Sequence, residues 1–212
     1  FFRALTFWAG FKTTKVYYYI YLSPLSYLEI GNNAKIGEGA FYGCAKLNSI
    51  KLGEGAKIGN YAFYNATNLK DIDLSKAVSI GDYAFSGDVL YEFTDENLTY
   101  VRQKDDGSYY YSYYAPLFTE IDLSSLTSLG VEAFAHCQKL AKVTLGDKIT
   151  EVPQRAFANC AVLESINLHN VEKIGLEAFA ETAIKKLELG AIKEIGNYAF
   201  VSCVKLADIA LP

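Results

Sequence analysis

An alanine-phenylalanine pair recurs through this chain, and its recurrence constrains the fold more than any other feature. Successive pairs lie 22, 22, 49, 23, 22 and 21 residues apart, so a single interval departs strongly from the period. The pairs end in Phe41, Phe63, Phe85, Phe134, Phe157, Phe179 and Phe200. Such a period is the mark of a solenoid, in which each unit is too small to bury its apolar face alone. We therefore expect stacked coils, with these phenylalanines forming an inward ladder that solvent does not reach.

Apolar residues at fixed distances from each phenylalanine predict the strands. An aliphatic residue precedes each phenylalanine by five positions, and an apolar-x-apolar triplet follows, as in Ile50–Leu52. Alternation of this kind indicates a short, half-buried strand, and its copies lie side by side as parallel strands about 4.8 Å apart. Leu28–Ile30 stands 22 residues before the Ile50 triplet and begins the series. The sequence therefore predicts one parallel sheet of about eight short strands.

The Ala-Phe segments between the strands have helical spacing over about one turn. Asn60, Asp82 and Asn197 stand near the start of these segments and are candidates for the N-cap. We expect one turn of α-helix or 3₁₀-helix in each segment, on the other side of the coil from the sheet. The predicted fold class is thus an α/β solenoid, a repeat array with one parallel sheet.

The repeat unit resembles the BspA-like branch of the leucine-rich repeat superfamily, whose units look like I-G-x-x-A-F-x-x-C-x-x-L-x-x-I-x-L. The resemblance covers residues 28–211 and departs between Phe85 and Phe134, and again after Phe179, where one residue is missing. It implies a curved right-handed solenoid, typically part of a secreted or surface protein of bacteria or protists that binds other macromolecules. It implies no active site.

The chain divides into an N-terminal flank and the repeat array. We expect residues 1–27 to cover the open end of the first coil and residues 28–211 to form the solenoid. The chain contains no methionine, which indicates a processed or trimmed piece of a longer protein. It stops directly after a strand without a polar cap. We therefore expect that the native protein continues there or that this end meets another molecule.

The long interval between Phe85 and Phe134 predicts an insertion at about residues 91–117. Within it, Asn97–Arg102 and Tyr109–Tyr114 flank the turn sequence Lys104–Gly107, which is a strong hairpin signal. The candidate contact residues of this hairpin are Tyr109, Tyr110, Tyr111, Tyr113 and Tyr114. Tyrosines on a loop held by a rigid scaffold are typical of binding surfaces. Packing of alternate tyrosines against the solenoid is the other interpretation.

The solvent side of the predicted sheet is a second candidate surface, on what the resemblance makes the concave face. Its central positions are Lys51, Asp73, Asp122, Thr144, Asn167 and Glu188. Solenoids bind macromolecules through such faces, although ordinary solvation of an exposed strand explains polar residues equally well.

Composition and motifs exclude several function classes. The net charge of −4 argues against a nucleic-acid partner, and no apolar run approaches the roughly 18 residues of a membrane span. Cys44, Cys137, Cys160 and Cys203 all follow a phenylalanine by three residues, so they are one buried structural position rather than reactive thiols. Their parallel arrangement suits neither a disulfide nor a metal site. We predict no catalytic residue, no cofactor and no metal.

The sequence therefore favours a non-catalytic, adhesin-like module at the cell surface or outside the cell. Its expected partner is a protein or a glycan, for example on a host cell or in extracellular matrix. The alternative is a structural spacer that holds another domain away from a surface and has no partner of its own. The oligomeric state and the identity of the partner stay open.

Overall fold

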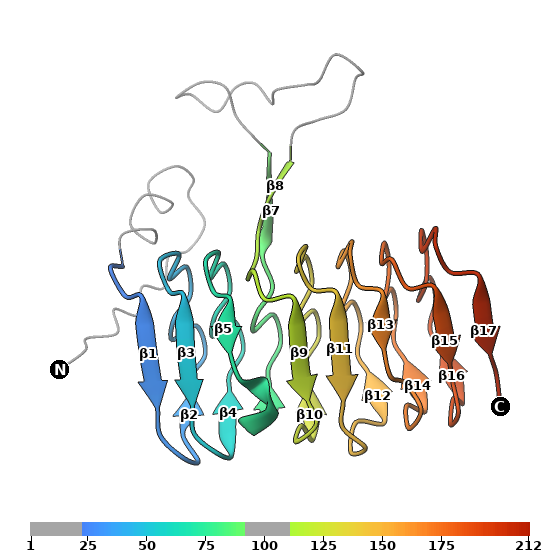
Figure 1. Cartoon of the computed structure of the whole chain (residues 1–212), viewed down its shortest axis with the longest axis horizontal. Coiled ribbons are helices and arrows are strands. Elements are labelled where there is room, and N and C mark those ends of the chain that lie inside the picture. Colours follow the sequence, from blue (N-terminus) through green and yellow to red (C-terminus); the bar gives the residue numbers. More distant parts are fainter. Residues whose placement is uncertain (1–22, 92–110) are drawn as a thin grey trace.

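The chain winds into about seven coils that follow one another along its long axis (Figure 1). The structure is a computed structural model that describes residues 23–91 and 111–212. Successive coils contribute one short strand to a front ladder and one to a back ladder, and the chain ends on a further front strand, β17. The fold is thus a β-solenoid.

The front ladder contains the eight strands that the triplets predict. They are β1 (Tyr27–Ile30), β3 (Ser49–Leu52), β5 (Asp71–Ile72), β9 (Glu120–Leu123), β11 (Lys142–Leu145), β13 (Ser165–Ile166), β15 (Lys186–Glu188) and β17 (Asp208–Ala210). Equivalent residues pair in parallel, so that Ile50 lies opposite Leu28 and Ile72. The ladder is divided into three sections, β1-β3-β5, β9-β11-β13 and β15-β17, whereas one sheet was expected.

A second parallel ladder runs along the back of the coils, and the sequence analysis missed it. Its strands are β2 (Lys35–Ile36), β4 (Ala56–Ile58), β6 (Ala77–Ile80), β10 (Ser128–Leu129), β12 (Glu151–Val152), β14 (Lys173–Ile174) and β16 (Glu194–Ile195). They form two sections, β10-β6-β4-β2 and β12-β14-β16. Each strand ends on the aliphatic residue five positions before a phenylalanine. A strand of two residues has too few positions for an alternating pattern, which explains the omission.

Both ladders are interrupted at particular junctions between coils. The front ladder is interrupted between β5 and β9, around the insertion, and between β13 and β15, where equivalent residues are 21 apart. The back ladder is interrupted between β10 and β12, where the interval is 23. A change in repeat length does not by itself break a ladder, because β11 pairs with β13 across 23 residues and β14 pairs with β16 across 21.

The predicted one-turn helices are wrong, because the Ala-Phe segments are turns. In the first coil, Gly39 and Gly43 flank Phe41 with positive φ angles of 59° and 66°. In later coils non-glycine residues such as Tyr61 and Asn65, with φ of 55° and 58°, occupy the same places. Left-handed residues two positions before and after the phenylalanine are incompatible with a helix. Among the described residues, the 3₁₀ element is η1 (Leu74–Lys76), which follows β5.

The turn segments form a third set of bonds between coils. The N–H groups of Gly39, Phe41 and Gly43 donate to carbonyl groups of the next coil at 2.7–2.8 Å. The intervening residues donate three positions back within their own coil, as Tyr42 does to Gly39. Every other N–H group therefore joins neighbouring coils, and the same pattern recurs along the array.

Asn60 and Asp82 bridge coils and do not cap helices. Asn60 Oδ1 accepts a hydrogen bond of 2.9 Å from the Asp82 N–H group, and Asp82 Oδ1 accepts one of 2.8 Å from the Val131 N–H group. Both side chains accept hydrogen bonds from backbone N–H groups, as an N-cap residue does. The N–H groups belong to the following coil and not to the segment that the sequence analysis expected them to cap.

The interior is organised by the phenylalanine ladder, and the predicted burial is confirmed for its five inner members but wrong for the two at its ends. Phe63, Phe85, Phe134, Phe157 and Phe179 are fully buried, and neighbouring rings of the series stack with centroids 5.3–5.7 Å apart. Phe41 and Phe200, at the two ends of the series, are partly buried. The stack continues from Phe85 to Phe134 at 5.4 Å, so the insertion does not interrupt the core.

Candidate functional site

The insertion stands off the row of coils as an antiparallel hairpin (Figure 1). Its strands are β7 (Asp88–Tyr91) and β8 (Tyr111–Tyr114), with Asp88 opposite Tyr114 and Tyr91 opposite Tyr111. The predicted hairpin is confirmed in its second strand only, because Tyr111–Tyr114 pairs with Asp88–Tyr91 and not with Asn97–Arg102. The predicted partner strand, the turn Lys104–Gly107, Tyr109 and Tyr110 lie outside the described residues.

The hairpin spans Asp88–Tyr114, close to the insertion expected at about residues 91–117. Phe41 precedes Ile50 by nine residues, whereas Phe85 precedes Ile121 by 36, and removal of the 27 residues from 88 to 114 restores nine. Ala115 then occupies the position that Cys44 has in the first coil, and like Cys44 it is buried. The coil therefore closes around the base of the hairpin, and the hairpin supplies no position of the repeat.

The front ladder presents the predicted polar residues to solvent. The exposed side chains are Lys51, Asp73, Asp122, Thr144, Asn167 and Glu188. The neighbours of Lys51 in β3, Ile50 and Leu52, are buried, so the expected alternation is confirmed. Lys51 Nζ lies 2.6 Å from the Glu29 carboxylate of the preceding coil. This ion pair is so exposed that it contributes little to stability.

Three members of this surface have structural roles. Asp73 caps η1 by accepting a hydrogen bond from the Ser75 N–H group at 3.1 Å, and Asp122 accepts one from the Ser124 N–H group at 2.8 Å. The Asn167 amide accepts from the Leu145 N–H group and donates to the Leu145 carbonyl, at 2.7 and 3.0 Å. These side chains are therefore less available to a partner than the sequence analysis assumed.

Four tyrosines on the turn segments make a surface that the sequence analysis did not identify. Tyr42 stacks on Tyr64 with centroids 5.1 Å apart, and Tyr61 stacks on Tyr83 at 4.8 Å. Tyr61 and Tyr64 are tilted by 59° at 5.7 Å, which joins the two stacks. We call this cluster the tyrosine platform. Its signal was present in the sequence, because these residues precede a phenylalanine by two positions or follow it by one.

The cysteines occupy one structural position, as the sequence indicated. The thiols of Cys137, Cys160 and Cys203 each donate to the carbonyl group of a phenylalanine in the preceding coil, at 3.0–3.4 Å. All four cysteines are buried and free. Burial raises the pKa of the Cys160 thiol to about 12. Burial also raises the pKa of the Cys137 thiol well above its usual value, and the charge of the neighbouring Cys160 raises it further.

The cysteines are expected to resist alkylation while the protein is folded. Since the thiolate is the reactive form, Cys137 and Cys160 should stay unmodified by iodoacetamide at about pH 8. After denaturation all four should react, as intact-mass spectrometry would record. Rapid labelling of Cys137 in the folded chain would contradict this burial.

Among the described residues, no group of three histidine, cysteine or carboxylate side chains is arranged to hold a metal ion. The described part of the chain also contains no helix long and apolar enough to cross a membrane.

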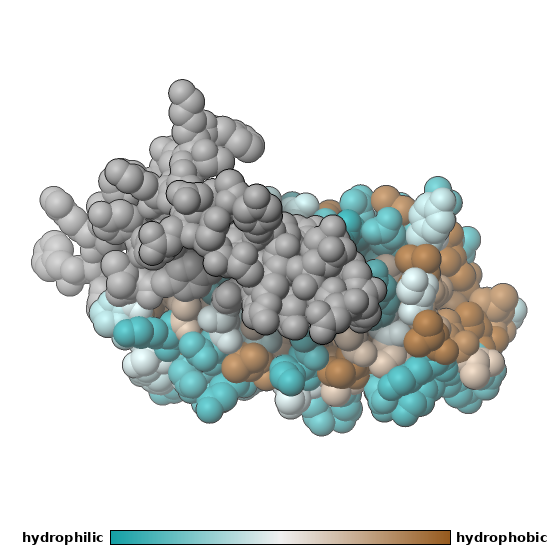
Figure 2. All heavy atoms as spheres, turned by 90° about the horizontal axis from the view of Figure 1, so that it is seen from above, coloured by the Kyte–Doolittle hydropathy of each residue, from teal (hydrophilic) through white to brown (hydrophobic). Residues whose placement is uncertain are grey.

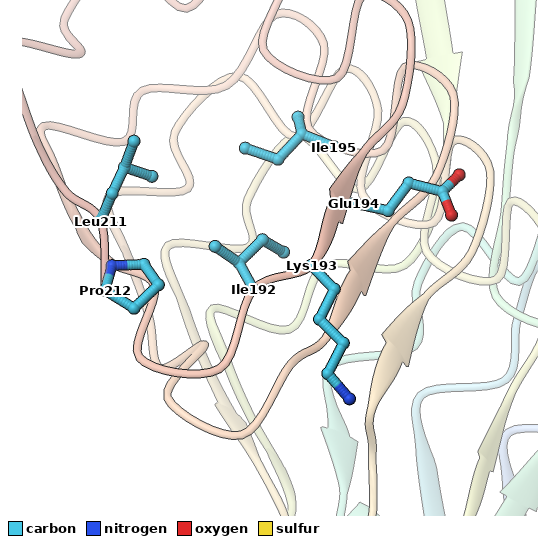
Figure 3. Close-up of a pocket in the computed structure, with 6 residues that line it drawn as sticks. All are labelled: Ile192, Lys193, Glu194, Ile195, Leu211 and Pro212. Carbon is cyan, nitrogen blue, oxygen red and sulfur yellow. The ribbon is translucent and has the colours of Figure 1, made fainter.

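Apolar side chains gather at the right-hand end of Figure 2, which is the C-terminal end of the coils in Figure 1. An open depression of about 320 Å³ lies there, lined by Ile192, Lys193, Glu194, Ile195, Leu211 and Pro212. Figure 3 shows Ile192 and Ile195 on one side of it and Leu211 and Pro212 on the other. A depression with such a lining offers no arrangement of reactive groups.

Comparison with protein-family models found a repeat family that matches this chain. The family model for the BspA type leucine-rich repeat region matches in six copies over residues 12–104 and 107–212. No curated protein matches the chain. The chain is similar to the crystal structure of a leucine-rich repeat protein from Bacteroides ovatus, with 21% identity, a TM-score of 0.43, and 83% of this chain and 58% of that chain covered. It therefore spans less than two thirds of that protein.

A second similar crystal structure is that of a leucine-rich cell surface protein from Faecalibacterium prausnitzii. The identity is 17% and the TM-score 0.41, with 89% of this chain and 79% of that chain covered.

Proposed function

Because the chain belongs to the BspA type leucine-rich repeat family, we propose that it is a non-catalytic module that binds other macromolecules. Its place is the cell surface or the extracellular space, and its partner is a protein or a glycan. Adhesion is the activity that such a module serves.

The hairpin is the observation that carries this proposal. β7 and β8 leave the array between Gly87 and Ala115, while the phenylalanine stack passes the same point without a gap. A segment that the core does not need is free to serve contact with a partner. A rigid scaffold that holds such a segment in place lowers the entropic cost of binding.

Removal of the hairpin is expected to abolish binding and leave the array folded. A variant that joins Gly87 to Ala115 has a coil of the regular length, so its circular dichroism spectrum should keep the strand signal of the parent. Affinity for a partner identified among host-surface or extracellular-matrix proteins should fall about thirtyfold or more, as loss of a central aromatic contact does. Surface plasmon resonance measures the change.

A front-face substitution is the matched control. Thr144→Arg places a large charged side chain on the exposed face of β11, away from the structural contacts of Asp73, Asp122 and Asn167. If this variant loses binding and the hairpin deletion keeps it, the front ladder carries the function. If the intact chain binds no macromolecule at all, the spacer interpretation replaces the proposal.

A further inference from the structure

The side chains two positions before each phenylalanine form a column along the turn segments. Its members are Gly39, Tyr61, Tyr83, Glu132, Arg155, Glu177 and Tyr198, all with φ between 52° and 59°. Tyr61 and Tyr83 are parallel to within 2° and 4.8 Å apart, and the Tyr83 hydroxyl donates to Glu132 at 3.4 Å. Arg155 then lies between Glu132 and Glu177, at 3.5 and 3.6 Å. Neighbouring coils therefore place their side chains in contact along this column.

Gly39 is the member of the column without a side chain. A Cβ atom added at Gly39 would meet none of the described residues within 4 Å. Tyr83 covers the face of the Tyr61 ring that points to the third coil, whereas the column offers no side chain on the face that points to the first coil. A flat apolar group above Gly39 would lie against Tyr61 at the spacing that Tyr61 and Tyr83 already have.

Polar and aromatic groups surround this position. Glu38 and Ala40, on either side of Gly39, are exposed, and the ring of Tyr42 is 40% exposed. Burial raises the pKa of Tyr61, and the charges of Asp82, Glu132 and Glu38 raise it further. The Tyr61 hydroxyl therefore stays protonated as a hydrogen-bond donor, beside a carboxylate of Glu38 that accepts.

We propose that the face of Tyr61 above Gly39 binds one neutral pyranose residue of a glycan. This inference rests on the proposed binding function and names its ligand class. The C–H groups on one face of a pyranose suit the negative face of an aromatic ring, and its hydroxyl groups suit a carboxylate acceptor and a phenol donor. Glu38 and Asp82 disfavour sialic and uronic acids by charge. The position is one ring wide, whereas a protein partner needs about 800 Å² on each side.

Direct binding of simple sugars tests the inference on the full chain. The probes are the methyl glycosides of glucose, galactose and N-acetylglucosamine, with sialyllactose as the acidic comparison. Saturation-transfer NMR detects contact, and titration calorimetry gives the affinity. We expect at least one neutral probe to bind and sialyllactose to bind less well.

Two substitutions at the site and one beside it assign the binding to this position. Gly39→Tyr supplies the ring that the column lacks, at a φ that Tyr61 and Tyr83 already adopt, so the coil should fold while its own ring displaces the sugar. Tyr61→Ala removes the platform. Each should weaken binding about tenfold or more, the usual effect of losing an aromatic contact. Gly37→Tyr, where an added Cβ atom also meets no atom of the described part of the chain within 4 Å, should bind as the parent does.

The outcomes separate this inference from the proposed function. Absence of binding for all neutral probes, or unchanged binding by Gly39→Tyr, overturns the sugar site. A protein partner that is lost on removal of residues 88–114 would in either case leave the proposed function intact. Loss of sugar binding in Gly39→Tyr with a native circular dichroism spectrum supports the site.

Discussion

Replacing Phe134 by alanine is expected to lower the free energy of unfolding by about 3–5 kcal/mol, the usual cost of removing a fully buried phenylalanine. Phe134 is inaccessible to solvent and stacks on Phe85 and Phe157 at 5.4 and 5.6 Å. Phe118 also packs against it edge-on at 6.1 Å. The cavity would therefore open between two coils at once. Urea denaturation followed by circular dichroism measures the loss.

Phe200→Ala is the matched control for this prediction. Phe200 is partly buried and stacks on Phe179 alone among the rings of the series, so its removal should cost well under half as much. Equal losses for the two variants would mean that the interior of the stack is not where the array gains its stability.

The second large effect is expected at Gly130, where two coils approach each other closely. A Cβ atom at this position would lie 2.3 Å from the Gly81 carbonyl carbon and 2.4 Å from the Asp82 nitrogen. Both are backbone atoms held by the bonds between coils, so they cannot move aside as a flexible side chain would. Gly130→Ala should destabilise the protein by about 3 kcal/mol, the upper end of the range for overpacking. Thermal and urea unfolding both report the change.

Gly37 occupies the equivalent position in the first described coil and provides the comparison. Within residues 23–91 and 111–212, an added Cβ atom there meets no other atom within 4 Å. Gly37→Ala should therefore be neutral or slightly stabilising, because alanine restricts the unfolded chain. If Gly37→Ala destabilises as much as Gly130→Ala, the effect comes from helix or strand propensity and not from contact between coils.

The repeat period determined most of what the sequence predicted correctly. The spacing alone places the five inner phenylalanines of the series, from Phe63 to Phe179, in the core and Ile50 in the front ladder, because each unit must bury the same face. The polar side chains of the front ladder follow from alternation. The family resemblance is confirmed by a model that matches nearly the whole chain.

The features that the sequence did not predict depend on contacts between coils. Helical spacing around Phe63 suggested a helix, but Tyr61 and Asn65 adopt positive φ angles so that their N–H groups reach the next coil. Local propensity cannot reveal this, because the stabilising partner lies about one repeat away. The tyrosine platform was missed for the same reason. Tyr42 and Tyr64 are far apart in sequence and become neighbours through stacking of the coils.

The three sets of bonds between coils also determine how the molecule would respond to tension along its long axis. Coils joined end to end carry such a load in series, so the weakest junction governs the strength of the whole array. The junction of the β10 and β12 coils lacks the back pairing, and that of the β13 and β15 coils lacks the front pairing. At both junctions the turn bonds persist, as from Phe134 to Ala156 and from Phe179 to Ala199. A junction that lacks one of the two ladders is thus a place where a pulled array would part first.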